Sequence, residues 1–250
     1  MMSLNLSIQN NIAVEKLALQ RADGLHPAAI AVVKNSLTQL KEIRHSFLHE
    51  KEQDFFDTLK LPKVQHSYLL GRYAAKMALS IFMDDIVLTD ARISSGIFQQ
   101  PVLYLTEAGN VQLSISHTTE MGIAVVFPEG HPMGVDVEAV NAEQTETIKG
   151  IITPNEKQKL PLIDADANKS LTILWTIKEA LSKVLKTGLM TPFHLYEIDN
   201  IELRGEIVVC SFINFPQYQS ISWISNGHAW SLVLPKKSLL DTTIISRLYL

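Results

Sequence analysis

The stretch WTIKEALS, residues 175–182, decides the expected fold together with YAAKMALS, residues 73–80. The two stretches are identical at four of eight positions, and each begins with an aromatic residue. Both lie in segments whose apolar residues recur at helical spacing, over residues 67–82 and 169–186, and strand-like segments follow each. Short helical matches also arise by chance, so duplication and coincidence both stay open. A true duplication would give two similar α+β halves.

Most of the remaining pattern predicts strands and turns. Residues 111–116 alternate between apolar and polar, and residues 122–127 and 133–140 are apolar runs of strand length. The tail, residues 193–234, alternates like several antiparallel strands. Further expectations are helices and loops over residues 12–62, short strands at 86–89 and 102–105, and a capped helix start at 153–156.

Composition indicates an ordinary globular protein. Hydrophobic residues make up 46% and charged residues 19% of the chain, and a single cysteine, Cys210, excludes an internal disulfide. The formal net charge of −4 argues against a general nucleic-acid binder. Residues 1–116 are charge-balanced, so the acidic excess lies in the second half. No apolar run has the length of a membrane span, and the N-terminus does not resemble a signal peptide, so we expect a cytoplasmic protein.

Two carboxylates share one face of the strand predicted over GVDVE, residues 134–138. Residues two apart on a strand point the same way, so Asp136 and Glu138 project together while Val135 and Val137 face the core. Neighbouring carboxylates repel each other unless a proton or a cation lies between them. An exposed strand face with two solvated acids is the commoner explanation of such a pair. The motif therefore indicates a cation site only in combination with others.

The helix over residues 169–186 carries Trp175, Glu179 and Lys183 on the side opposite its apolar stripe. A surface ion pair between Glu179 and Lys183 is the plain interpretation, and it would be worth only roughly a few tenths of a kcal/mol. Trp175 favours a cleft wall instead, because it shares the supposedly solvated side. The first-half stretch has Met77 where the second has Glu179, which favours a function for Glu179.

The segment SISH, residues 114–117, ends a predicted strand with hydroxyl and imidazole groups that can bind phosphate. A serine hydrolase is not favoured, because Ser116 and His117 point to opposite faces of the strand and the chain contains no Gly-x-Ser-x-Gly elbow. A strand-end histidine satisfied by backbone groups is the alternative.

In their order and spacing, these three segments resemble the 4′-phosphopantetheinyl transferases of the surfactin-synthetase-activating type. Leu70–Arg72 with Lys76, and Thr153–Glu156, are further matches, and the resemblance spans about residues 50–200. It implies two similar α+β subdomains in a pseudo-twofold arrangement, with the active site at their interface. The N-terminal subdomain, residues 1–116, would contact coenzyme A. The C-terminal subdomain, residues 117–250, would bind metal and carry the catalytic residues.

The implied activity is that of a Mg²⁺-dependent, holo-[acyl-carrier-protein] synthase type transferase. It would move 4′-phosphopantetheine from coenzyme A to a serine of an acyl, polyketide or peptidyl carrier protein and release 3′,5′-ADP. A monomer suffices if two halves of one chain form the site. Neither nucleic acid nor a membrane is expected as a partner.

The resemblance also implies roles for individual residues. Asp136, Glu138 and Glu179 would hold Mg²⁺, which prefers oxygen ligands. Glu179 would accept the serine proton and Lys183 would offset charge on the phosphates, and with His117 they form the expected catalytic set. Coenzyme contacts are expected from Lys63, Arg72, Ser116, His117, Asp136, Lys178, Glu179 and Lys183.

One departure from the family pattern bears on function. Gln99-Gln100-Pro101 stands where many relatives carry Gly-Lys-Pro, and a neutral glutamine cannot make the charge-assisted phosphate contact of a lysine. Lys63 and Arg72 are then expected to serve the 3′-phosphate. The departure supports an alternative, a non-catalytic relative that binds coenzyme A or a carrier protein. A metal-dependent phosphohydrolase is a third reading, although such enzymes gather more ligands. Glu156 stays open between a catalytic and a helix-capping role.

Overall fold

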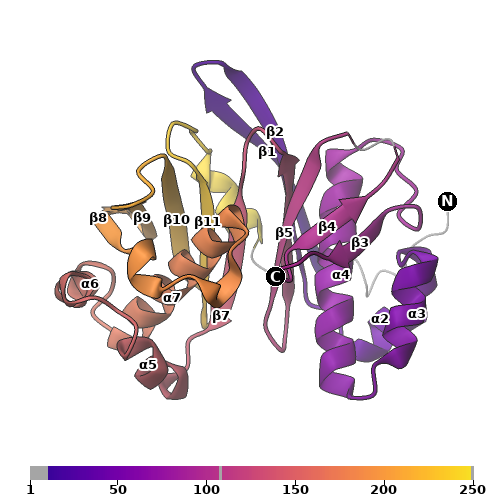
Figure 1. The fold of residues 1–250 in the computed structure, drawn as a ribbon, viewed down its shortest axis with the longest axis horizontal. Coiled ribbons are helices and arrows are strands. Elements are labelled where there is room, and N and C mark those ends of the chain that lie inside the picture. Colours follow the sequence, from indigo (N-terminus) through magenta and orange to yellow (C-terminus); the bar gives the residue numbers. More distant parts are fainter. Residues whose placement is uncertain (1–10, 107–108, 249–250) are drawn as a thin grey trace. The chain divides into compact units, whose positions relative to one another are not determined.

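The computed structural model describes residues 11–106 and 109–248, which fall into two compact units (Figure 1). Unit 1 ends at Gly130 and takes in the C-terminal segment from Leu239, and unit 2 runs from His131 to Ser238. The boundary expected from the sequence, between residues 116 and 117, falls inside β5 (Val111–His117). Because β5 forms an antiparallel hairpin with the strand that follows it, the chain leaves unit 1 only after that strand.

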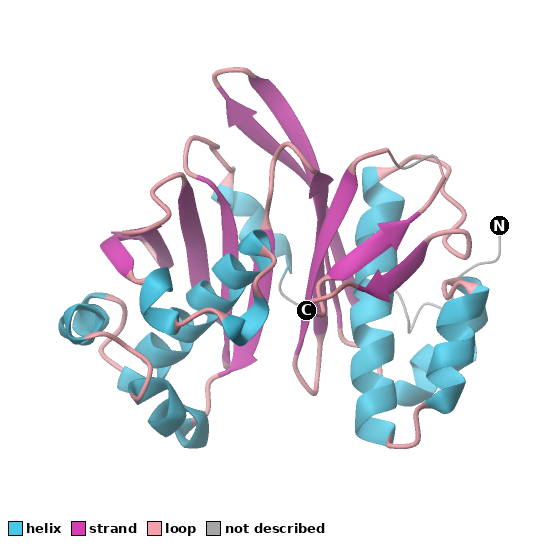
Figure 2. Ribbon diagram, in the orientation of Figure 1, coloured by secondary structure: helices cyan, strands magenta, loops and turns pink. Residues whose placement is uncertain are grey.

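Unit 1 contains a four-stranded antiparallel sheet that packs against one long helix, α4 (Figure 2). The strand order is β1-β2-β6-β5, and a separate two-stranded sheet, β3-β4, packs beside β5. Its elements are β1 (Ile12–Arg21), β2 (Gly24–Val33), α2 (Leu37–Ile43), η1 (Arg44–Ser46), α3 (Glu50–Thr58), α4 (Pro62–Phe82), β3 (Arg92–Ser95), β4 (Pro101–Tyr104), β5, β6 (Gly122–Pro128) and η5 (Thr242–Leu248).

Unit 2 contains a five-stranded antiparallel sheet in the order β7-β11-β10-β9-β8, on which helix α7 packs. Among the helices of the described residues, none is both long and apolar enough to cross a membrane. The elements of unit 2 are β7 (Gly134–Ala139), α5 (Ala142–Lys149), α6 (Pro154–Lys159), η2 (Leu160–Leu162), α7 (Ala167–Leu185), η3 (Gly188–Met190), η4 (Phe193–Tyr196), β8 (Ile198–Arg204), β9 (Ile207–Phe212), β10 (Tyr218–Ser225) and β11 (His228–Pro235).

A glycine lets each long helix approach its sheet closely. A Cβ on Gly122 of β6 would lie 2.6 Å from the backbone oxygen of Leu70 in α4. A Cβ on Gly134 of β7 would collide with the backbone oxygen of Ala180 in α7 and come within 2.9 Å of the Val184 side chain. Any larger residue at either position would force the helix away from the sheet.

Each unit also contains a buried ion pair between a helix-capping glutamate and the lysine shared by the two stretches quoted above. Lys76 lies 3.0 Å from Glu52 in unit 1, and Lys178 lies 2.7 Å from Glu156 in unit 2. Each glutamate closes a capping box, with His49 or Thr153 as the N-cap, and accepts a backbone N–H from a later strand, that of Ile93 or Ile198. This repeated network favours duplication over coincidence.

Two expectations are wrong. Residues 12–62 begin with a β-hairpin and not with helices and loops: β1 and β2 pair along their whole length, and Gly24 adopts a positive φ of 135° where the second strand begins. The strand expected at residues 86–89 is irregular, and the strand comes later, at β3. The backbone oxygens of Leu88 and Ala91 instead accept hydrogen bonds from the Lys76 ammonium, which holds this segment against α4.

The other expected elements are confirmed to within a few residues, including the mixed helix and sheet class. Helix α4 begins earlier than expected, at Pro62 in its first turn. Helix α7 ends at Leu185, and its C-cap residue Lys186 adopts a left-handed φ of 56°.

Candidate functional site

Unit 2 holds a cluster of ionisable side chains where β7 faces α7. Asp136 is only 3% exposed, and the Lys183 ammonium donates to its Oδ1 at 2.7 Å and to the backbone oxygen of Val135 at 3.0 Å. Glu138, from the same strand face, and Glu179, from the helix, are half-buried beside them. The partner of Lys183 is therefore a strand carboxylate across the packing interface, and not Glu179 on its own helix.

The face of α7 that carries these groups is not a solvated surface. Trp175, Glu179 and Lys183, each four residues from the next, are half-buried, while the residues between them are fully buried. Trp175 acts to lower the pKa of Glu138, against the larger effect of burial, which raises it. These three side chains are therefore partly shielded from solvent, and the cleft wall expected from the sequence stays a prediction.

The cluster raises the pKa of two of its acids toward neutrality. Burial is the main cause of the rise in the pKa of Glu138 to about 7, and the nearby Asp136 carboxylate adds to it. The pKa of Glu179 also rises to about 7, through burial first and then the charge of Asp136. The Lys183 ammonium lowers the pKa of both carboxyls, but by less than burial raises it. One ammonium therefore does not neutralise the charge of three carboxylates. Bound protons or a cation must neutralise the rest of the negative charge.

These three carboxylates are the predicted magnesium ligands, yet they do not form a ready-made cage. Across residues 11–106 and 109–248, no three His, Cys, Asp or Glu side chains are arranged to hold a metal ion. Oδ1 of Asp136 accepts the Lys183 ammonium instead. The chemistry of the donor set still fits Mg²⁺, because it is made only of oxygen and its internal repulsion would fall when a divalent cation bound. The metal site stays a prediction.

Lys178, expected among the coenzyme contacts, is fully buried and belongs to a separate ion pair. Its ammonium pairs with Glu156 and donates to the backbone oxygen of Phe193 at 3.1 Å. Burial lowers the pKa of Lys178, and the Glu156 carboxylate opposes that shift. Glu156 is itself 1% exposed and committed to the helix cap, to Lys178 and to Ile198. This geometry favours a structural role for both residues.

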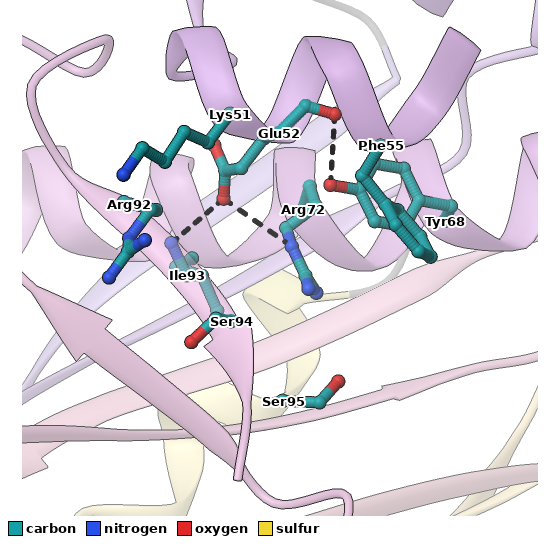
Figure 3. A pocket seen from close by; sticks show the side chains of 9 residues that line it. All are labelled: Lys51, Glu52, Phe55, Tyr68, Arg72, Arg92, Ile93, Ser94 and Ser95. Carbon is teal, nitrogen blue, oxygen red and sulfur yellow. Dashed lines mark hydrogen bonds and ion pairs between the residues drawn. The ribbon is translucent and has the colours of Figure 1, made fainter. Parts of the chain in front are cut away.

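Unit 1 contains two adjoining cavities, of 290 and 260 Å³, which share four lining residues. Figure 3 shows the larger one, with Lys51, Arg72 and Arg92 contributed by α3, α4 and β3. We call the two together the unit 1 cleft. The shared residues are Phe55, Tyr68, Arg72 and Ser95.

The smaller cavity brings together two residues predicted from the sequence, Arg72 and His117. Gly71 permits this, because a Cβ there would lie 3.1 Å from the Ile115 side chain of β5 and 3.8 Å from the His117 ring. The Arg72 guanidinium lies 4.8 Å from the centre of the Tyr68 ring, and its Nε is 3.4 Å from Glu52. His117 is exposed, whereas Ser116 is buried on the other face of β5 and does not line the cavity.

Two other groups near the unit 1 cleft have different roles. Lys63 is exposed and lines a separate cavity with His66 and Thr119, which shares only Ser67 with the cleft. The side chain of Gln100 accepts a hydrogen bond from the backbone N–H of Phe98 at 2.9 Å, within its own loop.

The sequence analysis did not select Lys51, Phe55, Tyr68 or Arg92 as site residues. No motif marks them, because they reach the cleft from α3, α4 and β3 and become neighbours only when these elements pack together. A positive charge on a helix surface looks the same in sequence whether or not a cavity lies beside it.

Comparison with known proteins places this site in context. Residues 132–233 match the family model described as "4'-phosphopantetheinyl transferase superfamily". The matched segment lies inside unit 2 and contains Asp136, Glu138, Glu179 and Lys183. The search of curated protein sequences gave no match. The similarity is thus to the unit that carries the acidic cluster.

Three solved structures are also similar to the chain. A holo-(acyl-carrier-protein) synthase from Bacillus anthracis, in complex with CoA (3',5'-ADP), is 21% identical, with 47% of this chain and 94% of that chain covered and a TM-score of 0.34. A holo-ACP-synthase from Plasmodium yoelii is 18% identical over 47% and 92%, with a TM-score of 0.32. A Thermotoga maritima holo-[acyl-carrier-protein] synthase is 18% identical over 55% and 73%, with a TM-score of 0.33. At such scores the likeness does not extend to the chain as a whole.

Proposed function

We propose that this chain is a Mg²⁺-dependent 4′-phosphopantetheinyl transferase that modifies a serine of a carrier protein. One observation carries the proposal: the segment that matches the transferase family contains a half-buried cluster of three carboxylates and one lysine, two of whose acids have pKa values of about 7. A structural ion pair does not require two further acids beside it. A cytoplasmic, monomeric enzyme of the surfactin-synthetase-activating type is part of the same proposal.

Unit 2 would provide the reaction centre. Asp136, Glu138 and Glu179 would hold Mg²⁺, which when bound would orient the coenzyme A pyrophosphate and withdraw charge from it. Lys183 would face the phosphate oxygens and stabilise the charge that builds on the departing 3′,5′-ADP. Glu179 has a pKa near the working pH, which suits a group that accepts a proton.

The transfer is a displacement at phosphorus, in which one bond forms and one bond breaks. The carrier serine Oγ forms a bond to the phosphorus that bears pantetheine, and the bond from that phosphorus to the leaving 3′,5′-ADP oxygen breaks. The serine proton passes to the Glu179 carboxylate, directly or through a water molecule. Asp136 and Glu138 keep their positions on β7 throughout.

Unit 1 would provide contacts to the nucleotide end of coenzyme A. Its cleft combines a guanidinium, an imidazole and aromatic faces, which suit a phosphate and an adenine. Arg72 is then the leading candidate for the 3′-phosphate. Lys63 is the weaker one, since it lines a different cavity.

Transfer itself is tested by mass spectrometry of carrier proteins incubated with the enzyme, coenzyme A and Mg²⁺. We expect each accepted carrier to gain one phosphopantetheine, with no gain when EDTA replaces Mg²⁺. If coenzyme A binds but no acyl, polyketide or peptidyl carrier gains phosphopantetheine, the non-catalytic relative is favoured. The hydrogen bond of Gln100 within its own loop supports the same alternative. Release of 4′-phosphopantetheine without an acceptor would favour a phosphohydrolase.

The assignment of Arg72 is tested by a comparison of two substrates. Arg72→Gln should raise KM for coenzyme A about tenfold or more, because a charge-assisted hydrogen bond contributes roughly 1.5–3 kcal/mol. The same variant should have a nearly unchanged KM for 3′-dephospho-coenzyme A, which lacks the group that Arg72 is proposed to bind. Lys63→Gln serves as the matched control. Equal effects of Arg72→Gln on both substrates would show that Arg72 does not contact the 3′-phosphate.

A further inference from the structure

The larger cavity of the unit 1 cleft gathers more positive than negative charge. Lys51, Arg72 and Arg92 line it from three different elements (Figure 3), and of the described residues that line it Glu52 is the one carboxylate. No carboxylate of the described residues forms an ion pair with Lys51 or Arg92. A cavity lined by charges of one sign concentrates ions of the opposite sign, so this cavity favours an anion.

Glu52 does not supply the missing negative charge, because its carboxylate is already committed. It is 2% exposed, and it accepts the backbone N–H groups of His49 and Ile93, each at 2.9 Å. The buried Lys76 ammonium lies 3.0 Å from it and neutralises its charge, while Arg72 Nε lies farther away, at 3.4 Å. The cations that face the cavity therefore lack a counter-charge of their own.

Aromatic rings hold the two guanidinium groups of the cavity. Arg72 lies over the Tyr68 ring, 4.8 Å from its centre, and Arg92 lies over the Tyr104 ring at 4.1 Å. Tyr104 is the partner of Arg92 in the β3-β4 ladder, so the second stack is set by the pairing of the two strands. A guanidinium stacked through its face keeps the N–H groups at its edge for other partners. Both stacks thus orient donors and leave them available for a ligand.

The chemistry of these groups suits a phosphate. Guanidinium groups match phosphate oxygens with pairs of parallel N–H donors, and an ammonium adds a compact positive charge. The hydroxyl groups of Ser94 and Ser95, which also line the cavity, can donate to further oxygens. At 290 Å³ the cavity is no larger than the lower limit of small-molecule sites, about 300 Å³, so it suits a compact anion better than a whole nucleotide.

We propose that the larger cavity of the unit 1 cleft binds a phosphate dianion between Lys51, Arg72 and Arg92. The dianion is either free phosphate or the phosphate monoester of a larger ligand. This inference goes beyond the proposed function, because the cavity lies within unit 1 and would bind free phosphate whether or not unit 2 supports transfer. Lys51 and Arg92 are the contacts that it adds to Arg72.

The test is calorimetric titration of the full chain with inorganic phosphate alone, at constant ionic strength. Lys51→Gln and Arg92→Gln should each raise the Kd for phosphate about tenfold or more, because each removes a charge-assisted hydrogen bond. Lys51 is exposed, so its variant decides the question even if Arg92→Gln fails to fold. Lys41→Gln removes the same charge from an exposed position on α2 outside the cavity and should bind phosphate like the wild type. A wild type that binds no phosphate, or wild-type affinity in the folded cavity variants, would overturn the proposal.

Titrations with coenzyme A and with 3′-dephospho-coenzyme A distinguish the two sources of the phosphate. If the 3′-phosphate occupies the cavity, Lys51→Gln weakens binding of coenzyme A but not of the dephospho form. If Lys51→Gln weakens binding of inorganic phosphate and of neither coenzyme, the cavity takes free phosphate; both results support the site. Phosphate binding by a protein that transfers nothing would leave this inference intact, and an active transferase that binds no phosphate would overturn this inference alone.

Discussion

Glu179→Gln should abolish transfer and yet stabilise the metal-free protein at pH 8. Loss of a proton acceptor that is also a proposed metal ligand should lower kcat at least about 100-fold. The stability gain follows from the environment of the carboxylate. Burial and the charge of Asp136 raise the pKa of Glu179 from 4.5 to about 7, so its ionised form is disfavoured in the folded state.

The sign of the pH dependence follows from the same pKa. Between about pH 4.5 and pH 7 the folded protein retains a proton that the unfolded chain has lost, so the free energy of unfolding falls as the pH rises through this window. A shift of one pKa unit corresponds to about 1.4 kcal/mol. Partial exposure and coupling to Glu138 reduce the total, so we expect the variant to be more stable by about 1–2 kcal/mol at pH 8 and by little at pH 4.5.

Thermal unfolding at several pH values, with and without Mg²⁺, measures this prediction. Mg²⁺ should raise the Tm of the wild type at pH 8 and have much less effect on Glu179→Gln. Glu206→Gln, at an exposed position in the turn before β9, is the matched control and should change neither Tm nor kcat. A Glu179→Gln enzyme with near-wild-type kcat would remove Glu179 from the mechanism.

The parts of this protein that the sequence predicts well are those set by local spacing. Helical periodicity located α4 and α7, alternation located β5, and Thr153 with Glu156 predicted a capping box that the structure contains. In each case the residues that decide the structure are within one or two turns or strand repeats of each other. The strand face that Asp136 and Glu138 share is also predictable from local spacing, because residues two apart on a strand point the same way.

The features that could not be predicted from the sequence depend on contacts between residues that are distant along the chain. The Asp23-Gly24 pair is typical of a hairpin turn, but β2 is apolar enough to be taken for a helix segment until its pairing with β6 is known. Glu52 resembles an ordinary surface acid after the unusual N-cap His49, and only the fold brings Lys76 to it. The burial of Lys178 could not be predicted either, because its partner Glu156 lies 22 residues earlier in the chain.

Lys178→Met should be among the most destabilising substitutions in unit 2. It would leave the Glu156 carboxylate buried and without its ammonium partner, and removal of one member of a buried ion pair typically costs about 3–5 kcal/mol. The double variant Lys178→Met/Glu156→Gln removes both charges and should recover much of that loss. Urea unfolding followed by tryptophan fluorescence reports on unit 2 alone, because all three tryptophans lie within it.

Unit 1 offers the matched comparison for this ion pair. Lys76→Met removes the equivalent ammonium, but Arg72 stays 3.4 Å from Glu52 and keeps part of the charge compensation. Its effect should appear in far-UV circular dichroism with little change in the tryptophan signal, because the residue belongs to the other unit. If Lys178→Met lowered the free energy of unfolding by less than about 1 kcal/mol, its ion pair would not anchor unit 2. The backbone oxygen of Phe193, to which Lys178 also donates, would then need a different anchor.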